Sequence, residues 1–554
     1  MRAGGSGGPR FGYTCVGIKP VATATFEKIF GAFYTAEPVA RTITKWAVRG
    51  PSDSVLDPSC GDGVFLSSAA RRLEGMGSKN PQVWGIDINE DALQSVKARL
   101  PECRLVKADF FSSRPGDIPF FNAVIGNPPF IRYQNFNGSS RSTALARARE
   151  GGVHLPKLSS SWAPFLVHAA AFLAKGGRLG MVVPAELGHA RYAREVLSFL
   201  LRKFGWIRFC IFRKKLFPEL SEDTGLLLCE KFEKPCTWFS VAVLDDIQEA
   251  ESQNYVEYPV DLEAVRSGRT KLGHYLLSPE VRQLYGRLAE EKHVVRLGSV
   301  ADVGIGYVSG YNDYFHLSAA ERRRWRIPAD FLRPALLSLG DPPGVFVRRS
   351  EWENLTAEGR KVYLLAIPPV SQKQLPASII AYLKYGEQLG VPKRFKCRVR
   401  EPWYSVPHVR IGDAFLSYMS GQNPRLVKNC YNLVAPNTLH LVRFDKTSSA
   451  GAFLGGWYSS LTRLSCELEG HSLGGGMLKL EPSEAERVLI PLPWPREEPR
   501  LVKDLDAMIR RAQGEEAVDF VDHHVLRRRL GLSGTECACL RDAAAEMHKW
   551  RMHK

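Results

Sequence analysis

The sequence predicts a doubly wound α/β fold in its first half and a second domain of mixed α+β character after it. Short apolar runs alternate with amphipathic helical stretches, and three of these runs end in an acidic residue. The ends of parallel strands meet at one edge of a sheet, where open α/β sheets bind ligands. The second domain is expected because 554 residues exceed the usual size of a single domain.

Composition narrows the class of protein. A hydrophobic content of 44% is ordinary for globular chains, and the formal charge of +17 favours a polyanionic partner. The 11 cysteines are scattered and no signal peptide is recognised, which is typical of reduced thiols. No apolar run is long enough to cross a bilayer. We therefore expect a soluble cytoplasmic, nucleoid-associated protein that does not enter membranes.

The ordered part opens with a helix and a glycine-containing turn. The helix is expected to run from Thr35, as its cap, through Trp46. A strand over residues 54–57 follows, and then Gly61 and Gly63, where the backbone can approach a ligand closely. The dinucleotide fingerprint Gly-x-Gly-x-x-Gly is incomplete here, which disfavours a nicotinamide cofactor.

Acidic residues end three successive strands. Asp57 ends the first, Asp87 ends a strand at 83–88, and Asp109 follows a strand that begins at residue 105. An acid about twenty residues after a glycine-containing turn is the usual ribose ligand of nucleotide-binding folds. One such acid is commonly a helix cap, but three in succession indicate a shared crevice. Further strands are expected at 121–126, 177–184, 207–212 and 225–229, with a helix over 162–173.

Residues 127–130 are the centre of the predicted site. They read Asn127-Pro128-Pro129-Phe130 and follow an apolar strand that ends in glycine. Proline cannot donate to a sheet ladder, and each proline biases the residue before it away from helix. The result is a rigid extended loop that offers an amide, free carbonyls and an aromatic ring. These groups can hold a planar base that carries an exocyclic amine.

The ordered set of residues 57–63, Asp87, Asp109 and 127–130 resembles the motifs of S-adenosylmethionine-dependent N6-adenine DNA methyltransferases. Residues 31–40 resemble the cofactor motif that precedes the glycine-rich loop in the gamma, or TaqI-type, class. The resemblance extends through Phe217 and Pro218. In the second half, residues 303–310 and 474–480 resemble the target-recognition domain of that group. The resemblance as a whole implies a Rossmann-like class I methyltransferase domain joined to a DNA-binding domain.

The resemblance also implies roles for individual residues. The Asn127 side-chain oxygen and the Pro128 carbonyl would accept hydrogen bonds from the adenine amine. Pro129 stiffens that loop, and Phe130 and Phe217 would stack on the two faces of a base rotated out of the duplex. S-adenosylmethionine is the expected cofactor, with no metal. Its expected ligands are Thr35, Asp57, Cys60, Gly61, Gly63, Asp87, Asp109 and Phe110.

The same reasoning divides the chain into segments. We expect a disordered glycine-rich tail over 1–24, a methyltransferase catalytic domain over 25–245, and a linker or peripheral segment over 246–290. A target-recognition domain is expected over 291–497 and a helical segment over 498–554.

A basic stretch in the second domain is the expected contact with DNA. If residues 393–400 form a strand, then four cations share one face: Arg394, Lys396, Arg398 and Arg400. Like charges on one face repel each other unless an anion lies against them, which indicates phosphate contact. A second basic cluster, at 321–326, is interpreted as a solvated helix surface.

Other functions stay open at this point. The partner is expected to be duplex DNA, with a separate restriction endonuclease or defence complex, and the protein is expected to be a monomer. The alternatives are an RNA or protein-glutamine methyltransferase, and a catalytically silent DNA-binding subunit. Two weaker patterns are disfavoured: a cytosine-C5 nucleophile at Cys236, whose position in the fold is wrong, and zinc binding by the pairs at 523–524 and 537–539, whose spacing is wrong.

Overall fold

The structure is a computed structural model that describes residues 35–132, 134–188, 190, 192–218, 223–252, 255–267, 271–340, 344–445, 450–473 and 475–552. The expected tail at 1–24, the first part of the motif at 31–40, and Gly474 lie outside these residues. Within the described part, every helix is too short or too polar to span a bilayer.

A nine-stranded sheet dominates the first part of the chain, with the order β3-β2-β1-β4-β5-β7-β6-β8-β9. The pairs among β1 to β5 are parallel, and β8 pairs with β9 in the antiparallel sense. This order confirms the predicted doubly wound fold. The strands are β1 (Ser54–Asp57), β2 (Gln82–Asp87), β3 (Arg104–Lys107), β4 (Phe121–Gly126), β5 (Leu173–Pro184), β6 (Phe204–Phe212), β7 (Thr224–Phe232), β8 (Trp238–Leu244) and β9 (Glu257–Pro259).

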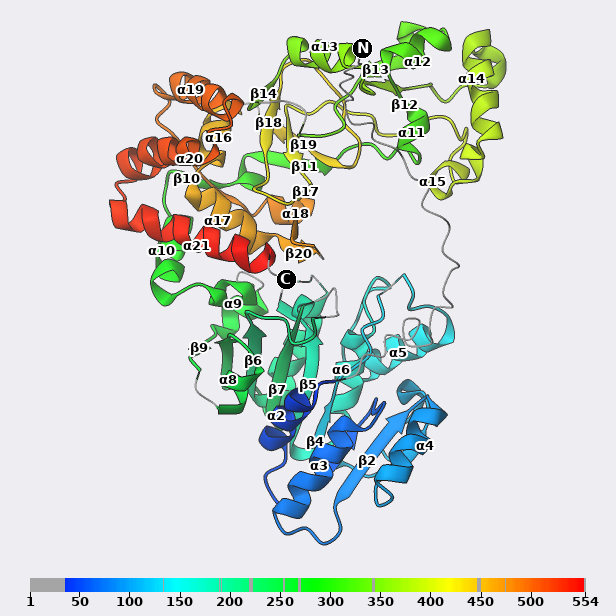
Figure 1. The fold of residues 1–554 in the computed structure, drawn as a ribbon, viewed down its shortest axis with the longest axis vertical. Coiled ribbons are helices and arrows are strands. Elements are labelled where there is room, and N and C mark those ends of the chain that lie inside the picture. Colours follow the sequence, from blue (N-terminus) through cyan, green and yellow to red (C-terminus); the bar gives the residue numbers. More distant parts are fainter. Residues whose placement is uncertain are drawn as a thin grey trace, which may run out of the picture. The chain divides into compact units, whose positions relative to one another are not determined.

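Helices connect the parallel strands. In Figure 1, α2 lies beside α3, and α5 lies beside α6. The connecting helices are α2 (Glu37–Ala47), α3 (Val64–Gly75), α4 (Glu90–Arg99), α5 (Gly138–Glu150), α6 (Trp162–Ala170) and α7 (Ala193–Lys203). The buried side of α2 is formed by apolar residues at helical spacing, such as Val39 and Ile43.

Three sequence expectations about these elements need correction. Thr35 does not cap α2: the cap position is Ala36, without a side-chain cap, and Pro38 sets the first turn. The sheet also continues beyond β7, the last strand expected from the sequence. The apolar run of β8 adds a strand, and β9 pairs with it as an edge. The helix predicted at 162–173 ends at Ala170, because β5 already begins at Leu173.

The strand order reverses at β1, which has β2 on one side and β4 on the other. Ligands bind at such a switch point, beyond the carboxyl ends of the strands. Val55 pairs with Ala123 and Leu56 with Val124, so the end of β1 lies beside the end of β4. The loop after β4 therefore starts next to Asp57.

The chain divides into two compact units. The first comprises the described residues up to Val183, with Ser198–Ile207 and Leu226–Thr237, and the second comprises Pro184–Leu197, Arg208–Gly225 and the residues from Trp238 onward. Among its described residues, the second unit contains four strand groups besides its share of the large sheet. They have the orders β10-β22, β11-β19-β16-β18-β14, β12-β15-β13 and β17-β21-β20.

Short strands and helices alternate through the second unit. The strands are β10 (Val294–Arg296), β11 (Ala301–Ile305), β12 (His316–Leu317), β13 (Leu332–Pro334), β14 (Phe346–Val347), β15 (Tyr363–Leu365), β16 (Ala414–Ser417), β17 (Met419–Ser420), β18 (Leu426–Asn429), β19 (Leu439–Phe444), β20 (His471–Leu473), β21 (Met477–Lys479) and β22 (Leu489–Pro491). The helices up to residue 398 are α8 (Ile247–Ser252), α9 (Leu262–Arg266), α10 (Pro279–Ala289), α11 (Asn312–Phe315), α12 (Ala319–Arg324), α13 (Arg349–Ala357), α14 (Ala377–Gln388) and α15 (Phe395–Arg398).

The last part of this unit is helical, as expected from the sequence. Its helices are α16 (Ala450–Trp457), α17 (Ser460–Glu469), α18 (Pro482–Ala485), α19 (Glu498–Arg510), α20 (Gly514–Val521), the π-helical segment η8 (Asp522–Arg529) and α21 (Gly534–Met552). α21 packs against α17, and the two run close together in Figure 1.

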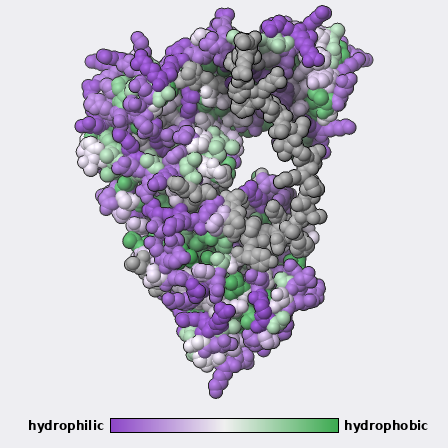
Figure 2. Space-filling view, in the orientation of Figure 1, coloured by the Kyte–Doolittle hydropathy of each residue, from purple (hydrophilic) through white to green (hydrophobic). Residues whose placement is uncertain are grey.

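The surface reflects the charged composition. Figure 2 shows a face covered mainly by hydrophilic residues, on which hydrophobic side chains form scattered patches. Such a distribution is ordinary for globular proteins.

Candidate active site

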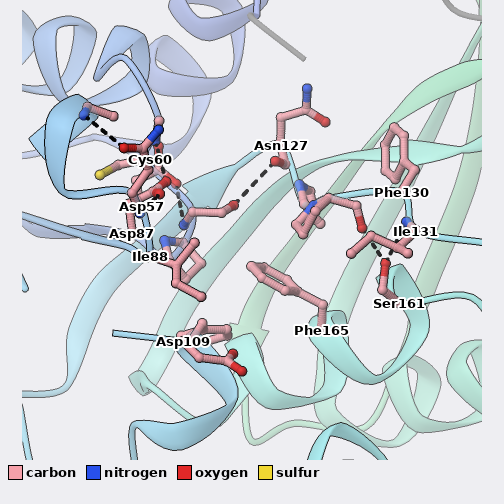
Figure 3. A pocket seen from close by; sticks show the side chains of 18 of the residues that line it. Asp57, Cys60, Asp87, Ile88, Asp109, Asn127, Phe130, Ile131, Ser161 and Phe165 are labelled. Atoms are coloured by element: carbon pink, nitrogen blue, oxygen red, sulfur yellow. Dashed lines mark hydrogen bonds between the residues drawn. The ribbon is translucent and has the colours of Figure 1, made fainter. Parts of the chain in front are cut away.

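A cavity of about 890 Å³ lies in the first unit, at the edge formed by the ends of β1 to β4. The acids that end three strands, the loop after β4 and the start of α6 all contribute to it. Its lining includes Thr35, Asp57, Cys60, Gly61, Asp87, Ile88, Asp109, Phe110, Asn127, Pro128, Pro129, Phe130, Ile131, Ser161 and Phe165. In Figure 3, Asp57 and Asp87 lie on one side of the view, Asn127, Phe130 and Ser161 lie on the other, and Phe165 lies between them.

Asp57 occupies the end of β1 and is 1% exposed. Its Oδ1 accepts a hydrogen bond from the Ser59 N–H at 3.1 Å, whereas no described residue pairs with its buried Oδ2. Burial raises the pKa of Asp57 well above its usual range, and the nearby Asp87 and Asp62 charges add to the rise. A buried carboxylate without a partner for one oxygen is suited to bind a cationic group.

The glycine-containing turn is held to the neighbouring strand. Asp87 accepts hydrogen bonds from the Gly61 N–H at 2.7 Å and from the Asn89 N–H at 2.8 Å. Gly61 has φ +48° and Gly63 has φ +82°, a left-handed conformation that favours glycine. Cys60 is buried, and burial raises the pKa of its thiol, so the thiol stays protonated. Cys60 therefore lines the cavity as a buried, protonated thiol and is not a nucleophile.

The third strand leads into an aromatic wall. Asp109 caps the short 3₁₀ turn at Phe110–Ser112 by accepting from the Phe111 N–H at 3.0 Å. The ring centroids of Phe110 and Phe165 lie 4.8 Å apart. Behind them, Nε2 of the buried His168 lies 3.2 Å from the Phe110 carbonyl oxygen and 3.1 Å from that of Ser113. Burial lowers the pKa of His168 to about 4, so the neutral ring can donate to these carbonyls.

Asn127 presents an oxygen without a partner at the cavity wall. Its Nδ2 donates to the Thr35 hydroxyl at 3.2 Å, and its main-chain carbonyl accepts from the Ser59 hydroxyl at 3.3 Å. Its Oδ1 is buried and pairs with no described residue. Because a buried amide oxygen without a partner is costly, this atom marks the place of a donor from a ligand.

The main-chain carbonyls of residues 127–129 differ in whether they accept a hydrogen bond from a described residue. The Asn127 carbonyl accepts from Ser59 and the Pro129 carbonyl accepts from the Ser161 hydroxyl. Between them, the Pro128 carbonyl has no donor among the described residues. Two free acceptors, this carbonyl and the Asn127 Oδ1, thus belong to adjacent residues.

The structure brings most of the predicted residues to one cavity: Thr35, Asp57, Cys60, Gly61, Asp87, Asp109, Phe110 and residues 127–130. Gly63, which precedes α3, is not among the described lining residues. Phe217 is buried, 2% exposed, and is also not among them. Its stacking role, like the role of each residue in the site, stays a prediction.

Sequence reasoning missed several lining residues. Ile88 follows the strand-end acid and is 53% exposed, an unusual exposure for an apolar residue next to a buried strand. Its position directly after Asp87 was the available signal. Ser161 and Phe165 come from α6, and nothing in the local sequence indicates that this helix reaches the loop after β4. Their contribution depends on tertiary packing.

The expected strand at 393–400 was wrong. Residues 395–398 form the short helix α15, after a 3₁₀ turn that contains Pro392. Cys397 is buried, whereas Phe395 and Val399 are 63% and 66% exposed, so the apolar residues do not share a buried face. The four cations consequently do not form one row. Arg394, Lys396 and Arg398 are exposed, whereas Arg400 donates to the carbonyls of Val308 and Ser309.

The second basic cluster lies on a helix surface. Residues 319–324 form the helix α12, as expected for a solvated basic surface. Among the described residues, no group of three histidine, cysteine or acidic side chains is placed to hold a metal ion.

Comparisons with known proteins agree with this geometry. Residues 21–195 match the N-6 DNA Methylase family, and residues 269–526 match the family described as "Type II methyltransferase M.Eco57I, C-terminal domain". The first match contains the cavity, and the second begins after it in the second unit.

Among curated proteins, the chain is 21% identical over 443 residues to the type II methyltransferase M.AccI of Acinetobacter calcoaceticus, which covers 76% of this chain and 77% of the relative. It is 20% identical over 472 residues to M.XamI of Xanthomonas campestris pv. amaranthicola, with coverage of 83% and 85%.

Among solved structures, the type IIL restriction-modification enzyme MmeI in complex with DNA has a similar fold, with a TM-score of 0.52 and 12% identity over 95% of this chain and 76% of that one. The switch-point cavity and its acids therefore lie in the part of this chain that is similar to N6-adenine DNA methyltransferases.

Proposed function

We propose that the cavity in the first unit binds S-adenosylmethionine together with an adenine rotated out of duplex DNA, and that methyl transfer to adenine N6 takes place on the loop at 127–130. The observation that carries this proposal is the buried Asn127 Oδ1, which has no partner among the described residues while its Nδ2 is held by Thr35. The Pro128 carbonyl supplies a second acceptor beside it.

The cofactor would occupy the side of the cavity lined by the strand-end acids. Asp57 would pair with the cationic methionine end, because its Oδ2 is buried without a partner. Asp87 would accept from the ribose hydroxyls with its remaining lone pairs. Asp109, Phe110 and the exposed Ile88 would surround the adenine ring of the cofactor. When bound, S-adenosylmethionine supplies the methyl group as a sulfonium, and the chain's own residues supply the orientation.

The acceptors address the main chemical difficulty of the reaction. The lone pair of an adenine amine is delocalised into the ring, so the nitrogen is a weak nucleophile. Hydrogen bonds from N6 to the Asn127 Oδ1 and the Pro128 carbonyl favour the form with a localised lone pair, and fixed acceptors stabilise the positive charge that develops on N6. Asn127 and Pro128 would hold N6 in place while it takes the methyl group from the sulfonium, and N6 would then lose one proton to solvent.

Thr35 would keep the amide in the productive orientation. An amide that donates from Nδ2 to a fixed hydroxyl oxygen must present Oδ1 on its other side. A flipped amide would present hydrogens to an amine that also carries hydrogens, which is repulsive. Phe130 would stack on the base, which N6 chemistry requires to leave the duplex.

We extend the proposal to DNA contact and domain roles. Residues 25–245 would form the catalytic domain and residues 291–497 the target-recognition domain. In the latter, the exposed cations Arg394, Lys396 and Arg398 would contact phosphates, whereas Arg400 is committed to main-chain carbonyls.

The relatives suggest the biological setting. They are named type II methyltransferases, and the similar solved structure is a restriction-modification enzyme in complex with DNA. We propose a gamma-class enzyme that acts in the cytoplasm, as a monomer, as the modification arm of a restriction-modification or defence system with a separate endonuclease. An RNA or protein substrate is not favoured by these relatives.

The test is the transfer of labelled methyl groups from S-adenosylmethionine to duplex DNA, to RNA and to protein in parallel. We expect label in duplex DNA, on adenine N6. Asn127→Ala should lower the transfer rate by about 10²–10³-fold, because one stabilising group at the reacting atom is lost. Asn354→Ala, which changes an exposed asparagine of α13, is the matched control and should leave the rate unchanged.

Calorimetry completes the test. The affinity of Asn127→Ala for S-adenosylmethionine should stay within about threefold of the wild type, because Asn127 is assigned to the base and not to the cofactor. Label in RNA or protein alone would overturn the substrate assignment. Cofactor binding without any transfer would favour a catalytically silent DNA-binding subunit.

A further inference from the structure

α6 contributes a buried serine that is bonded to the loop rather than to its own helix. Ser161 occupies the cap position of α6 and is 1% exposed. A serine at a helix cap ordinarily accepts a hydrogen bond from a main-chain N–H in the first turn. Here its side chain makes no cap hydrogen bond. The hydroxyl is used elsewhere.

The hydroxyl of Ser161 bridges the two peptide groups around Phe130. It donates to the Pro129 carbonyl, and it accepts from the Ile131 N–H at 2.8 Å. The main-chain N–H of Ser161 also donates to the Ile131 carbonyl at 3.0 Å. Figure 3 shows Ser161 beside Ile131, at the end of the loop away from Asn127.

The clamp matters because proline residues cannot hold the loop by themselves. Pro128 and Pro129 have no N–H to donate, so the loop must be fixed through its carbonyls and through Ile131. Ser59 fixes the first carbonyl and Ser161 fixes the third. The Pro128 carbonyl between them keeps its lone pairs for a ligand.

We propose that Ser161 is a positioning residue for methyl transfer, which acts through the loop at 127–130 and not through the cofactor. Its hydroxyl sets the direction of the Pro128 carbonyl and the plane of the Phe130 ring, and it supports no hydrogen bond to the strand-end acids. This inference rests on the proposed function of the cavity. It assigns to the start of α6 a role that the local sequence does not indicate.

Ser159 offers a closely matched control. It is 2% exposed, and its hydroxyl also donates to a proline carbonyl, that of Pro156, at 2.8 Å. Both hydroxyls are buried and donate to a proline carbonyl, but the Ser161 hydroxyl also accepts from the Ile131 N–H, and Ser159 is bonded away from residues 127–131. Ser159→Ala and Ser161→Ala each remove a buried hydroxyl, and only the second should affect the loop.

The experiment measures three quantities for both variants of the full chain: the melting temperature, the dissociation constant for S-adenosylmethionine, and the single-turnover rate of methyl transfer to duplex DNA at saturating cofactor and DNA. We expect similar melting temperatures and cofactor affinities within about twofold of the wild type. The rate should fall roughly ten- to a hundredfold for Ser161→Ala and less than twofold for Ser159→Ala, because small misplacements of reacting groups have large effects on rate.

Equal rates in the two variants would overturn the inference. So would a loss of cofactor affinity in Ser161→Ala beyond that in Ser159→Ala, because the hydroxyl would then support the cofactor side of the cavity as well as the loop. If Ser161→Ala shows no cooperative melting, Ser161→Cys takes its place, because cysteine keeps a side chain of similar size with a weak donor. The rate of Ser161→Cys should be lower than the rates of the wild type and Ser159→Ala, but by less than tenfold. A wild-type protein that transfers no methyl group would instead reject the proposed function.

Discussion

The cavity of the first unit and the basic turn at 394–400 of the second unit contrast in what determines the position of their side chains. In the cavity, Asp57, Asp87 and Asn127 stand at the ends of paired parallel strands, so backbone pairing fixes where each one lies. In the turn, Cys397 and Arg400 are fixed by side-chain contacts with Ser309. Residues placed by a sheet can be located from sequence, whereas residues placed by such contacts cannot.

The first way to test the contrast is to alter a strand-end charge. Asp57→Asn should weaken binding of S-adenosylmethionine by about 2 kcal/mol or more, roughly 30-fold, because a charged partner of the cofactor is lost. The same variant should melt at a higher temperature at neutral pH in the absence of cofactor. The reason is that the folded-state pKa of Asp57 is raised, so ionisation as the pH rises costs folding free energy that the amide avoids.

Calorimetry and thermal melting with and without cofactor check both effects. The raised pKa also predicts that the cofactor affinity of the wild type increases as the pH rises through it, whereas that of Asp57→Asn does not. An unchanged affinity in Asp57→Asn would contradict the placement of the cationic end.

A second variant disturbs the same acid through its neighbour. A β-carbon on Gly126 would lie 2.7 Å from the Asp57 Oδ1, so Gly126→Ala must displace the carboxylate. We expect roughly tenfold weaker cofactor binding and a stability loss of about 1–3 kcal/mol, measured by calorimetry and denaturant unfolding. Gly75→Ala is the control, because a β-carbon there would have no heavy atom within 4 Å. Equal effects of the two substitutions would contradict the proposal that the position of the Asp57 carboxylate determines cofactor binding.

The same contrast explains which parts of the fold and of the site can be predicted from the sequence. The strand ends, the doubly wound order and the loop at 127–130 were located correctly, because apolar runs, terminal acids and paired prolines are local signals. The role of α6 was not, since Ser161 and Phe165 reach the loop only through packing. The alternating charges at 394–400 wrongly indicated a strand. Pro392 favours a turn, and of the apolar residues in this stretch Cys397 is buried whereas Phe395 and Val399 are exposed.

The basic turn provides the third prediction. Lys396→Ala and Arg398→Ala should each weaken binding to duplex DNA severalfold and reduce the slope of log affinity against log salt by about 0.9, the value for one phosphate contact. Arg400→Ala should leave that slope unchanged. It should instead destabilise the fold by about 1–3 kcal/mol, because two main-chain carbonyls lose their donor.

Fluorescence anisotropy over a range of salt concentrations, with thermal melting of each variant, separates the two effects. A change in slope for Arg400→Ala that equals the change for Lys396→Ala would mean that all of these cations contact DNA, contrary to the distinction drawn here.

The smallest expected effect concerns His168 behind the aromatic wall. Its pKa is lowered from 6.5 to about 4, so the unfolded chain binds a proton more readily than the folded one, and stability is lost as the pH falls through this range. At pH 5.5 the wild type should lose about 1 kcal/mol relative to neutral pH from this group. His168→Gln, which can donate to the same carbonyls but does not titrate, should lack this component in thermal melting. Parallel pH profiles for the two proteins would contradict the assignment.

One amide at the end of β4, that of Asn127, is proposed to govern adenine methylation in DNA. The most direct measurement is sequencing that reports N6-methyladenine in DNA from cells that express either the wild type or Asn127→Ala at equal protein levels. The account predicts modified adenines in a defined sequence context with the wild type and none above background with the variant. Equal modification in both, or modified adenines with neither, would contradict it.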